Sequence, residues 1–567
     1  TIGVNSGKWY WEVINTSSTV ASVSVSGVIT QGTQAQVYSV YYNRNGNKGV
    51  GLLNGGLSES SYGATYTDDE IISVALNMDD NQITFFKNNA SQGTITDANL
   101  AGGDVIAWTQ NGANSGTLVG VYNFGADASF AGALTGTDIG EATDGNGKGL
   151  FKYAPPSGFL SLCTANLEEP TIGANSDTQS TDHFGILTYT GDGAQTRTIT
   201  SGDVNNGIGG QVDFKPDWVV QKIRSGTNQG AGNWDSTRGF TGTNALDWST
   251  ATAEGTWNGA SSAEYGFVSG VDTNDVSLND GTTATTGGYV NYNGRTYVLW
   301  NWKAGGAPTA TNSAGVGEIP TEGSVKIDGA NKGDALAGSI QATRQSVNTI
   351  SKFSITTFEG NNTKGATIAH GLGIKPDLII MKTLDIGTSW VVWFPNLQAN
   401  NQLLELNSTG GVLTNTGDVN AWWNNTPPDE NVITLGNYDG VNDNLSMLAY
   451  CFASVEGYSK VGKYVATGSG GEFVYLGFRP AWIMIKEVTS GGTQWLIFDS
   501  TRAPFNMIDD VVLSTTNQTE GFSSGMELDF LSNGFKIRGS NNDLSYSGKT
   551  HIYMAFAETS FKYSLAR

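Results

Sequence analysis

Short stretches of alternating apolar and polar residues run along the whole chain. "GKWYWEVIN" at 7–15 places large apolar residues on both faces of a strand, and "DDEIISVALNMDDNQITFFKNN" at 68–89 has the pattern of two strands joined by an Asn/Asp turn. No apolar run approaches the ~18–20 residues of a membrane-spanning helix. The pattern therefore predicts an all-β protein with no insertion into a membrane.

One apolar run occurs three times. It is written "PDWVVQK" at 216–222, "PDLIIMK" at 376–382 and "PAWIMIK" at 480–486. Proline fixes φ and blocks pairing at the strand entrance, and the apolar residues behind it indicate a strand buried on both faces. We expect the lysine to end each run where the strand meets water.

A constant spacing accompanies this run. "WDSTRG" begins at Trp234, twelve residues after Lys222, and "FDSTRA" begins at Phe498, twelve residues after Lys486. In the middle copy the same count from Lys382 leads to Phe394, in "FPNLQ". Such a register predicts one structural unit repeated three times.

These patterns divide the chain. We expect an N-terminal β-sandwich over 1–150, a proline-containing linker over 151–182, and three antiparallel β-sandwich repeats over 183–305, 351–458 and 459–567. The Gly/Ala-rich segment 306–350 is either a linker or an early strand of the second repeat.

Composition supports this fold class and restricts the kinds of partner that the chain can bind. The 567 residues include 76 glycines, only 14% are charged and 10% are aromatic, which is typical of turn-rich β proteins with aromatic cores. The formal net charge of −22 argues against nucleic acid and against an anionic membrane surface as partners. With Cys163 and Cys451 far apart, we expect no disulfide framework.

Residues for catalysis or metal binding do not gather in the sequence. The three histidines occupy different places in their repeats: His183, His370 and His551. No Cys/His pairs have zinc-site spacing, and the acidic turns do not match an EF-hand loop. We therefore expect a protein that is not an enzyme and that needs no cofactor and no metal.

The serines of the two Asp-Ser-Thr-Arg motifs also fail as nucleophiles. Ser236 and Ser500 lack flanking elbow glycines and have no histidine at a shared repeat position to act as base. A turn closed by Asp side-chain hydrogen bonds and by a salt bridge from Arg238 or Arg502 accounts for the motif better.

Tryptophans provide the one candidate binding site. "AWWNNTPPDEN" at 421–431 combines aromatic faces with amide and carboxylate groups in a Pro-rich loop, which is the composition of a sugar-stacking platform. The alternative is that one of the adjacent tryptophans is buried and the other lies at an interface. The candidate residues are Trp422, Trp423, Asn424, Asn425, Asp429 and, in a similar loop, Trp257.

The N-terminal segment resembles the SPRY family. Members open with a Gly-Lys-Trp-Tyr-like strand and carry a late hairpin that this chain matches at Asp69, Ile71, Val74, Leu76, Asn77, Ile83, Phe85, Phe86 and Asn88. The resemblance implies a bent antiparallel sandwich whose loops, in relatives, bind peptides or proteins.

The chain as a whole resembles virion appendage proteins of tailed, particularly marine, bacteriophages. The shared phrases are "KYAPPSGF" at 152–159, "TANLEEP" at 164–170, "PDWVVQK" at 216–222 and "LWNWKAGG" at 299–306. The resemblance implies a structural protein on the exterior of the virion, with other virion proteins as partners and with a homo-oligomeric, trimeric state.

Two functions remain open under that resemblance. The chain is expected to act as a tail-fibre component that attaches to host-surface glycans; the alternative is a capsid decoration or head-fibre protein that binds only other virion proteins. A polysaccharide depolymerase is the weaker third reading, since no reactive constellation is present. Exposed tryptophan loops favour attachment, whereas burial of every tryptophan favours a structural cement.

Overall fold

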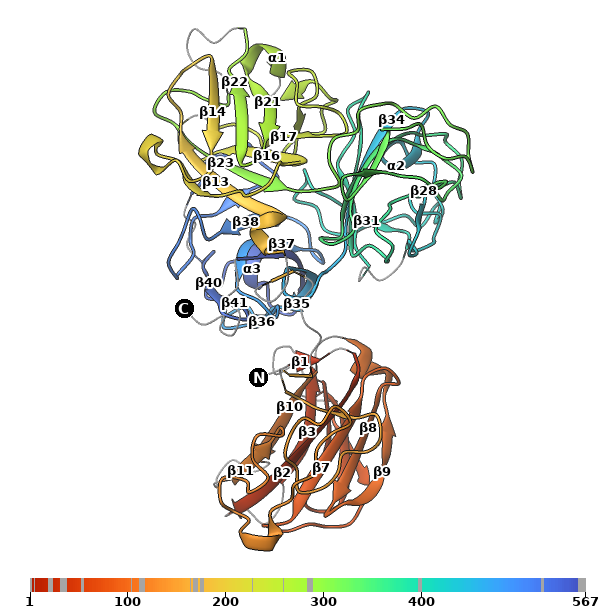
Figure 1. The fold of residues 1–567 in the computed structure, drawn as a ribbon, viewed down its shortest axis with the longest axis vertical. Coiled ribbons are helices and arrows are strands. Elements are labelled where there is room, and N and C mark those ends of the chain that lie inside the picture. Colours follow the sequence, from red (N-terminus) through yellow and green to blue (C-terminus); the bar gives the residue numbers. More distant parts are fainter. Residues whose placement is uncertain are drawn as a thin grey trace. The chain divides into compact units, whose positions relative to one another are not determined.

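The structure is a computed structural model. It describes residues 3–4, 6–18, 24–30, 38–52, 56–102, 105–111, 118–163, 165–166, 172–173, 178–226, 228–257, 260–282, 289–395, 400–521 and 525–558. The chain forms two compact units, Thr1–Glu169 and Pro170–Arg567. Strands dominate both units, which confirms the all-β prediction (Figure 1).

The N-terminal unit contains two six-stranded sheets that share one core. The first sheet has the order β1 (Gly3–Val4), β10 (Val105–Asn111), β3 (Ser24–Thr30), β4 (Tyr38–Asn43), β5 (Asn47–Leu52) and β6 (Ser58–Ser61). The second has the order β11 (Leu118–Asn123), β2 (Lys8–Ser18), β7 (Ile71–Asn77), β8 (Gln82–Lys87) and β9 (Ala90–Thr96), with β12 (Leu160–Ser161) parallel to β2. The strand expected at 7–15 and the hairpin expected at 68–89 are thus β2 and β7–β8, while the SPRY resemblance stays a prediction.

The first part of the expected linker packs onto this unit. Phe151 is buried against Tyr10, with ring centroids 5.1 Å apart. The buried carboxylate of Glu12 accepts hydrogen bonds from the backbone N–H groups of Lys152 (2.9 Å) and Tyr153 (2.8 Å). Because the chain is held there and then pairs through β12, the unit continues to Glu169.

The C-terminal unit contains three large sheets. The first has the order β15 (Gly209–Gln211), β13 (Phe184–Thr190), β23 (Thr296–Trp302), β16 (Trp218–Ile223), β17 (Gly232–Asp235) and β18 (Leu246–Asp247). The second has the order β25 (Ala330–Asn331), β24 (Val325–Ile327), β26 (Ala342–Asn348), β27 (Phe353–Glu359), β34 (Ser446–Phe452), β29 (Leu378–Thr383), β30 (Val391–Trp393), β31 (Gln402–Glu405) and β32 (Leu413–Thr414). The third has the order β35 (Ser459–Val465), β42 (Thr550–Ala557), β37 (Pro480–Glu487), β38 (Trp495–Asp499) and β39 (Val512–Leu513).

A smaller layer accompanies each of these sheets. The strands are β14 (Thr196–Thr200), β22 (Asp275–Asn279) and β21 (Phe267–Asp272) in the first repeat, β28 (Thr367–Ala369) and β33 (Val432–Thr434) in the second, and β36 (Phe473–Tyr475), β41 (Gly534–Ile537) and β40 (Leu528–Leu531) in the third. A short pair, β19 (Thr256–Trp257) and β20 (Ala260–Ser261), and the one-turn helices α1 (Ser262–Tyr265), α2 (Asp439–Asn442) and α3 (Asn542–Ser545) lie in the connections.

The three large sheets share one strand order. Each runs from an opening strand to the closing strand, the proline-led strand and the strand that follows it: β13-β23-β16-β17, β27-β34-β29-β30 and β35-β42-β37-β38. The proline-led strand is thus interior in every sheet. Segment 306–350 contributes β24 and β26 to the second sheet, which corresponds to the strand alternative rather than to the linker.

Each proline-led strand is buried on both faces, as expected. One face contributes to a single core shared by all three repeats, which contains Trp218, Leu378 and Trp482. The other face, at Val219, Ile379 and Ile483, packs in three separate cores between each sheet and its smaller layer. The repeats therefore bury their inner faces against one another within one chain.

The strand register corrects one sequence alignment. Val219 pairs with Trp234 and Ile483 with Phe498, but Ile379 pairs with Trp393 rather than with Phe394. The expected match at Phe394 was wrong by one residue, because the connection after Lys382 is one residue shorter. Phe394 thus occupies the position that aspartate holds in the other two repeats.

Candidate functional site

Two of the candidate sugar-stacking tryptophans are core residues. Trp423 is 1% exposed, and its Nε1–H donates to the Gln402 carbonyl at 3.0 Å. Trp257 is fully buried beside Trp234, with ring centroids 5.3 Å apart, and its Nε1–H donates to the Gly230 carbonyl at 3.2 Å. Neither indole has an open face for a sugar ring, so the interpretation of these two residues as stacking platforms is corrected.

The rest of that loop forms a turn. Trp422 is half-buried against the second repeat's core and contacts the Tyr438 ring edge-on. Asn424 and Asn425 adopt left-handed backbone conformations, with φ of 47° and 48°. The Asp429 carboxylate accepts from the N–H groups of Asn431 (2.7 Å) and Val432 (2.8 Å). One tryptophan is therefore buried, as the alternative interpretation proposed, while its neighbour is partly covered by the core of its own repeat.

The three histidines lie apart on different elements and are buried. The His183 ring bonds to the Asn348 side chain at 3.0 Å and the His370 ring to the Asp429 carbonyl at 3.1 Å, while His551 lies within β42. Burial lowers the pKa of His183 and of His370 to about 4 and also lowers the pKa of His551. Burial therefore disfavours the protonated form of all three rings, and each ring takes part in local hydrogen bonds.

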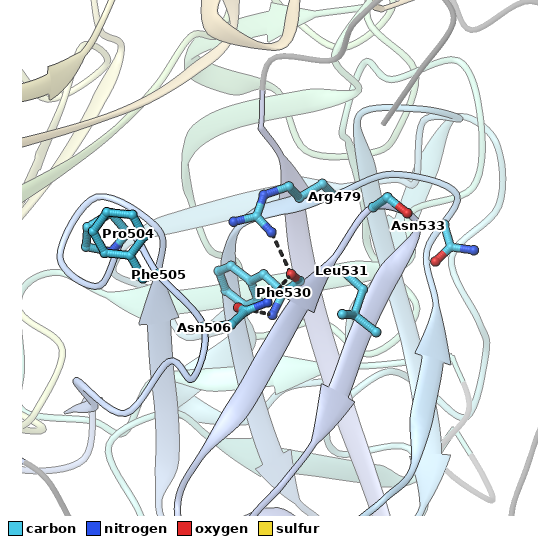
Figure 2. Close-up of a pocket in the computed structure, with 8 residues that line it drawn as sticks. Arg479, Pro504, Phe505, Asn506, Phe530, Leu531 and Asn533 are labelled. Atoms are coloured by element: carbon cyan, nitrogen blue, oxygen red, sulfur yellow. Dashed lines mark hydrogen bonds between the residues drawn. The ribbon is translucent and has the colours of Figure 1, made fainter. Parts of the chain in front are cut away.

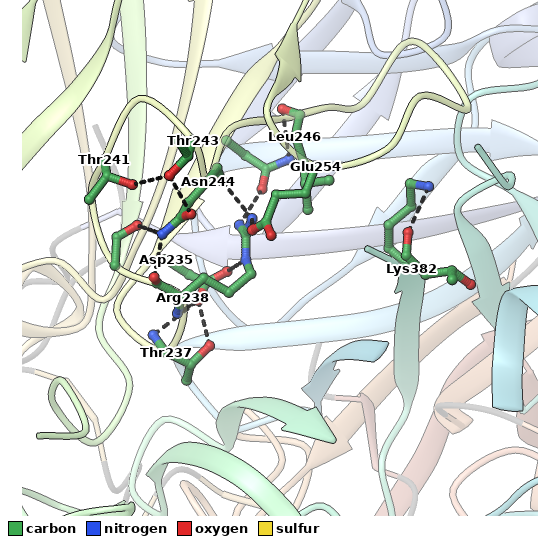
Figure 3. A network of polar contacts seen from close by, with 12 residues as sticks. Asp235, Thr237, Arg238, Thr241, Thr243, Asn244, Leu246, Glu254 and Lys382 are labelled. Carbon is green, nitrogen blue, oxygen red and sulfur yellow. Dashed lines mark hydrogen bonds and ion pairs between the residues drawn. The ribbon is translucent and has the colours of Figure 1, made fainter. Parts of the chain in front are cut away.

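The Asp-Ser-Thr-Arg motifs form buried ion-pair turns, as the sequence predicts. Asp235 accepts from the Thr237 N–H at 3.0 Å and pairs with Arg238 at 2.6 Å, and Arg238 also reaches Glu254 at 2.8 Å (Figure 3). In the third repeat Arg502 pairs with Asp499 at 2.5 Å and with Glu520 at 2.7 Å. Buried arginines that join two carboxylates fix these turns firmly.

The same aspartates connect neighbouring repeats. The Tyr450 hydroxyl of the second repeat donates to Asp235 of the first at 2.8 Å. The Trp300 indole N–H of the first repeat donates to Asp499 of the third at 3.0 Å. The two motifs are thus parts of the contact surfaces between repeats, which we call seams.

The lysines that end the proline-led strands are not at the water boundary. Lys222, Lys382 and Lys486 are fully buried, so the expectation that they meet water was wrong. Each ammonium group bonds to a backbone carbonyl six or seven residues further along its own repeat. The acceptors are Gln229 at 2.6 Å, Thr388 at 2.9 Å and Thr493 at 2.7 Å.

Each of these ammonium groups also reaches a carbonyl of another repeat. Lys222 of the first repeat bonds to Thr516 of the third at 3.0 Å. Lys486 of the third bonds to Thr409 of the second at 3.2 Å, and Lys382 of the second lies 3.5 Å from the Ala251 carbonyl of the first. The contacts run from repeat to repeat in a closed ring, so one buried lysine lies at every seam.

Burial changes the acid–base chemistry of these lysines. It lowers the pKa of Lys222 to about 7, against the opposing field of Asp247, and it lowers the pKa of Lys382 and of Lys486 to about 8. Buried ammonium groups with carbonyl acceptors are suited to joining backbone segments, because a lysine offers three donors. Sequence reasoning missed this role, although lysine at one position of all three repeats was the available signal.

The part of the chain that the structure describes contains neither a candidate membrane-spanning helix nor a candidate metal cluster. None of its helices has the length and apolar character needed to cross a membrane. Within the same residues, no three His, Cys, Asp or Glu side chains are grouped so that they could hold a metal ion.

Comparison with known families gives one match. The model of a family described as a domain of unknown function, DUF7483, matches residues 179–330 and 326–560. The first match begins just before the first repeat, and the second spans nearly all of the second and third repeats. No curated protein matches the sequence.

Proposed function

We propose that this chain, which belongs to the DUF7483 family, is a structural protein of a bacteriophage particle and that it binds other proteins of that particle. The observation that carries the proposal is the ring of three sheets around one shared core, with a buried lysine at every seam. Such a body is suited to holding a fixed shape and not to closing around a substrate. The resemblance of sequence phrases such as "KYAPPSGF" and "TANLEEP" to those of phage appendage proteins supports the proposed location on the particle.

The tryptophans support a structural role over glycan attachment. Of the 15 tryptophans, all but Trp108 and Trp422 are buried, and these two are half-buried. Sugar recognition by stacking needs an aromatic face that is open to solvent. The structural cement is therefore the better-supported alternative, and host attachment is the second.

Purified particles of the phage that encodes the chain would test this proposal. Quantitative mass spectrometry should find the chain in a fixed copy number per particle, and antibody labelling with electron microscopy should place it at defined external sites. Absence from purified particles, when the chain is present in infected cells, would refute the proposal.

A glycan array separates the two roles. The full-length chain should not bind neutral glycans above the background of an unrelated acidic β protein. Saturable binding to a defined glycan would instead favour host attachment.

A further inference from the structure

One loop of the third repeat presents apolar side chains to solvent. Residues 504–507 have the sequence Pro-Phe-Asn-Met, and all four are exposed between the buried Ala503 and Ile508. The Phe505 side chain is 81% exposed and Met507 is 46% exposed. Exposed apolar side chains that lie together, as Pro504, Phe505 and Met507 do, are typical of a protein interaction site.

This loop is held in place by its neighbours. The Asn506 side chain donates to the Phe530 carbonyl at 2.8 Å and accepts from the Phe530 N–H at 2.9 Å (Figure 2). Arg479 donates to the same carbonyl at 2.5 Å and pairs with Glu558 at 2.6 Å. Ile508 then exchanges two backbone hydrogen bonds with Leu528, at 2.7 and 3.1 Å.

Phe505 also borders a surface hollow. The hollow is lined by Arg479, by Pro504, Phe505 and Asn506 of the loop, and by residues 530–533 (Figure 2). A fixed aromatic projection beside a depression loses little conformational entropy on binding, which is the property of an interface anchor.

The first repeat shows that the fold does not require this exposure. After its own Asp-Ser-Thr-Arg turn, Phe240 is half-buried against the repeat's own core. The residues that follow are polar, and the Thr241 and Thr243 hydroxyls bond to each other at 3.1 Å (Figure 3). The apolar tip is therefore particular to the third repeat.

We propose that loop 504–507 is the docking site for a second protein of the particle, which receives Phe505 in an apolar pocket bordered by Lys or Arg side chains. The proposal rests on the proposed function and names its binding surface. The charge around the loop indicates which kind of protein binds there. Half-exposed Asp509 and Asp510 directly follow the loop, and the whole chain carries a formal net charge of −22. A basic rim complements this surface, whereas a second copy of the chain would bring the same acidic residues.

The test uses the full-length chain and phage particles assembled with its gene disrupted. Purified wild-type protein is added back, and the bound amount is measured by co-sedimentation over a concentration series. The test variant carries Phe505→Ser and Met507→Ser together. The matched control is Val204→Ser, which changes a 74% exposed apolar residue in the first repeat.

We expect the wild type and the Val204 control to bind equally and the double variant to bind about 10-fold or more weakly. Wild-type binding should also weaken as salt rises from 50 to about 300 mM, because the contact is partly electrostatic. Circular dichroism and melting curves must match between variants. If the double variant melts at a lower temperature than the wild type, the single variant Phe505→Ala is used in its place in the binding measurement.

The outcomes separate the two proposals. Equal binding by the wild type and the loop variant would overturn the docking site and leave the proposed function standing. Failure of the wild type to bind any particle component would overturn the proposed function, and the docking site with it. A wild-type self-association that the loop variant abolishes in sedimentation velocity would show that the occupant is a second copy, and would also overturn the proposal.

Discussion

The buried lysine of the first seam allows a test through pH. Lys222 is fully buried, and its pKa falls from 10.5 to about 7 because the ammonium group is desolvated. Between these two pH values the unfolded chain binds a proton at Lys222 that the folded chain has released. Stability must therefore rise with pH across this window, and it is lost as pH falls back toward 7.

The size of this effect follows from the two pKa values. Each pH unit inside the window is worth about 1.4 kcal/mol for a single group. Integrating between the folded and unfolded pKa values, one lysine adds about 3 kcal/mol to the free energy of unfolding between pH 7 and pH 9.5. Tyrosines of the unfolded chain begin to ionise near the upper end of this range, but their contribution is the same in variant and wild type and cancels in the difference between them.

The perturbation is Lys222→Met, which keeps an unbranched side chain only one atom shorter and removes the titrating group. At pH 7 the variant escapes a desolvation cost of about 4 kcal/mol. It also leaves the Gln229 and Thr516 carbonyls without this donor, at about 1–3 kcal/mol each. These terms are similar in size, so stability at a single pH does not decide the question, whereas its pH dependence does.

Guanidinium unfolding followed by tryptophan fluorescence at pH 7, 8, 9 and 9.5 provides the measurement. We expect the stability of the variant relative to wild type to fall by about 3 kcal/mol across this range. The control is Lys463→Met, because Lys463 is exposed on β35. A constant difference between Lys222→Met and wild type at every pH would show that Lys222 titrates as in water, and the buried seam contact would be refuted.

Three further outcomes are expected. Arg502→Met should lower the free energy of unfolding, measured by chemical denaturation, by about 3–5 kcal/mol, because the Asp499 carboxylate then stays buried without its arginine partner. Adding Asp499→Asn should recover part of this loss. Trp423→Ala should cost about 3–5 kcal/mol, since it empties a buried site in the second repeat, and a melting temperature equal to wild type would contradict this placement. A thiol reagent at pH 8 should label no more than one of the two cysteines in the folded chain, because burial raises the pKa of the Cys451 thiol to about 12. Rapid labelling of both cysteines would exclude that burial.

The strands could be predicted because the order of apolar and polar residues within a strand determines whether its faces are buried. The proline and the apolar run behind it define an interior strand wherever they occur, and β16, β29 and β37 follow that rule. The burial of the three lysines depends instead on contacts with residues far away in the sequence. One acceptor of the buried Lys222 ammonium is the carbonyl of Thr516, which lies almost three hundred residues later in the sequence.

The tryptophan loop failed as a prediction for the same reason. Adjacent Trp residues with Asn, Pro and Asp around them describe an exposed platform and a core-anchored turn equally well. The Gln402 carbonyl that holds the Trp423 indole comes from β31, and no local feature of 421–431 points to it. Composition restricts which chemistry a loop can offer, but long-range packing decides whether the loop offers it.

Differences between the seams explain where the repeats diverge. At two seams a donor on the closing strand meets a buried aspartate, as Trp300 does with Asp499 and Tyr450 with Asp235. At the third, the corresponding positions by strand register are Met554 and Phe394, both apolar members of the shared core. The loss of the aspartate in "FPNLQ" is therefore matched by loss of the donor in a different repeat. A carboxylate at position 394 would be buried in the apolar shared core, so phenylalanine there fits a repeat contact in which position 554 is methionine and offers no donor. The divergence of the second repeat at Phe394 is thus accompanied by a divergence of the third at Met554, and this distinguishes one seam from the two that have a donor and an aspartate.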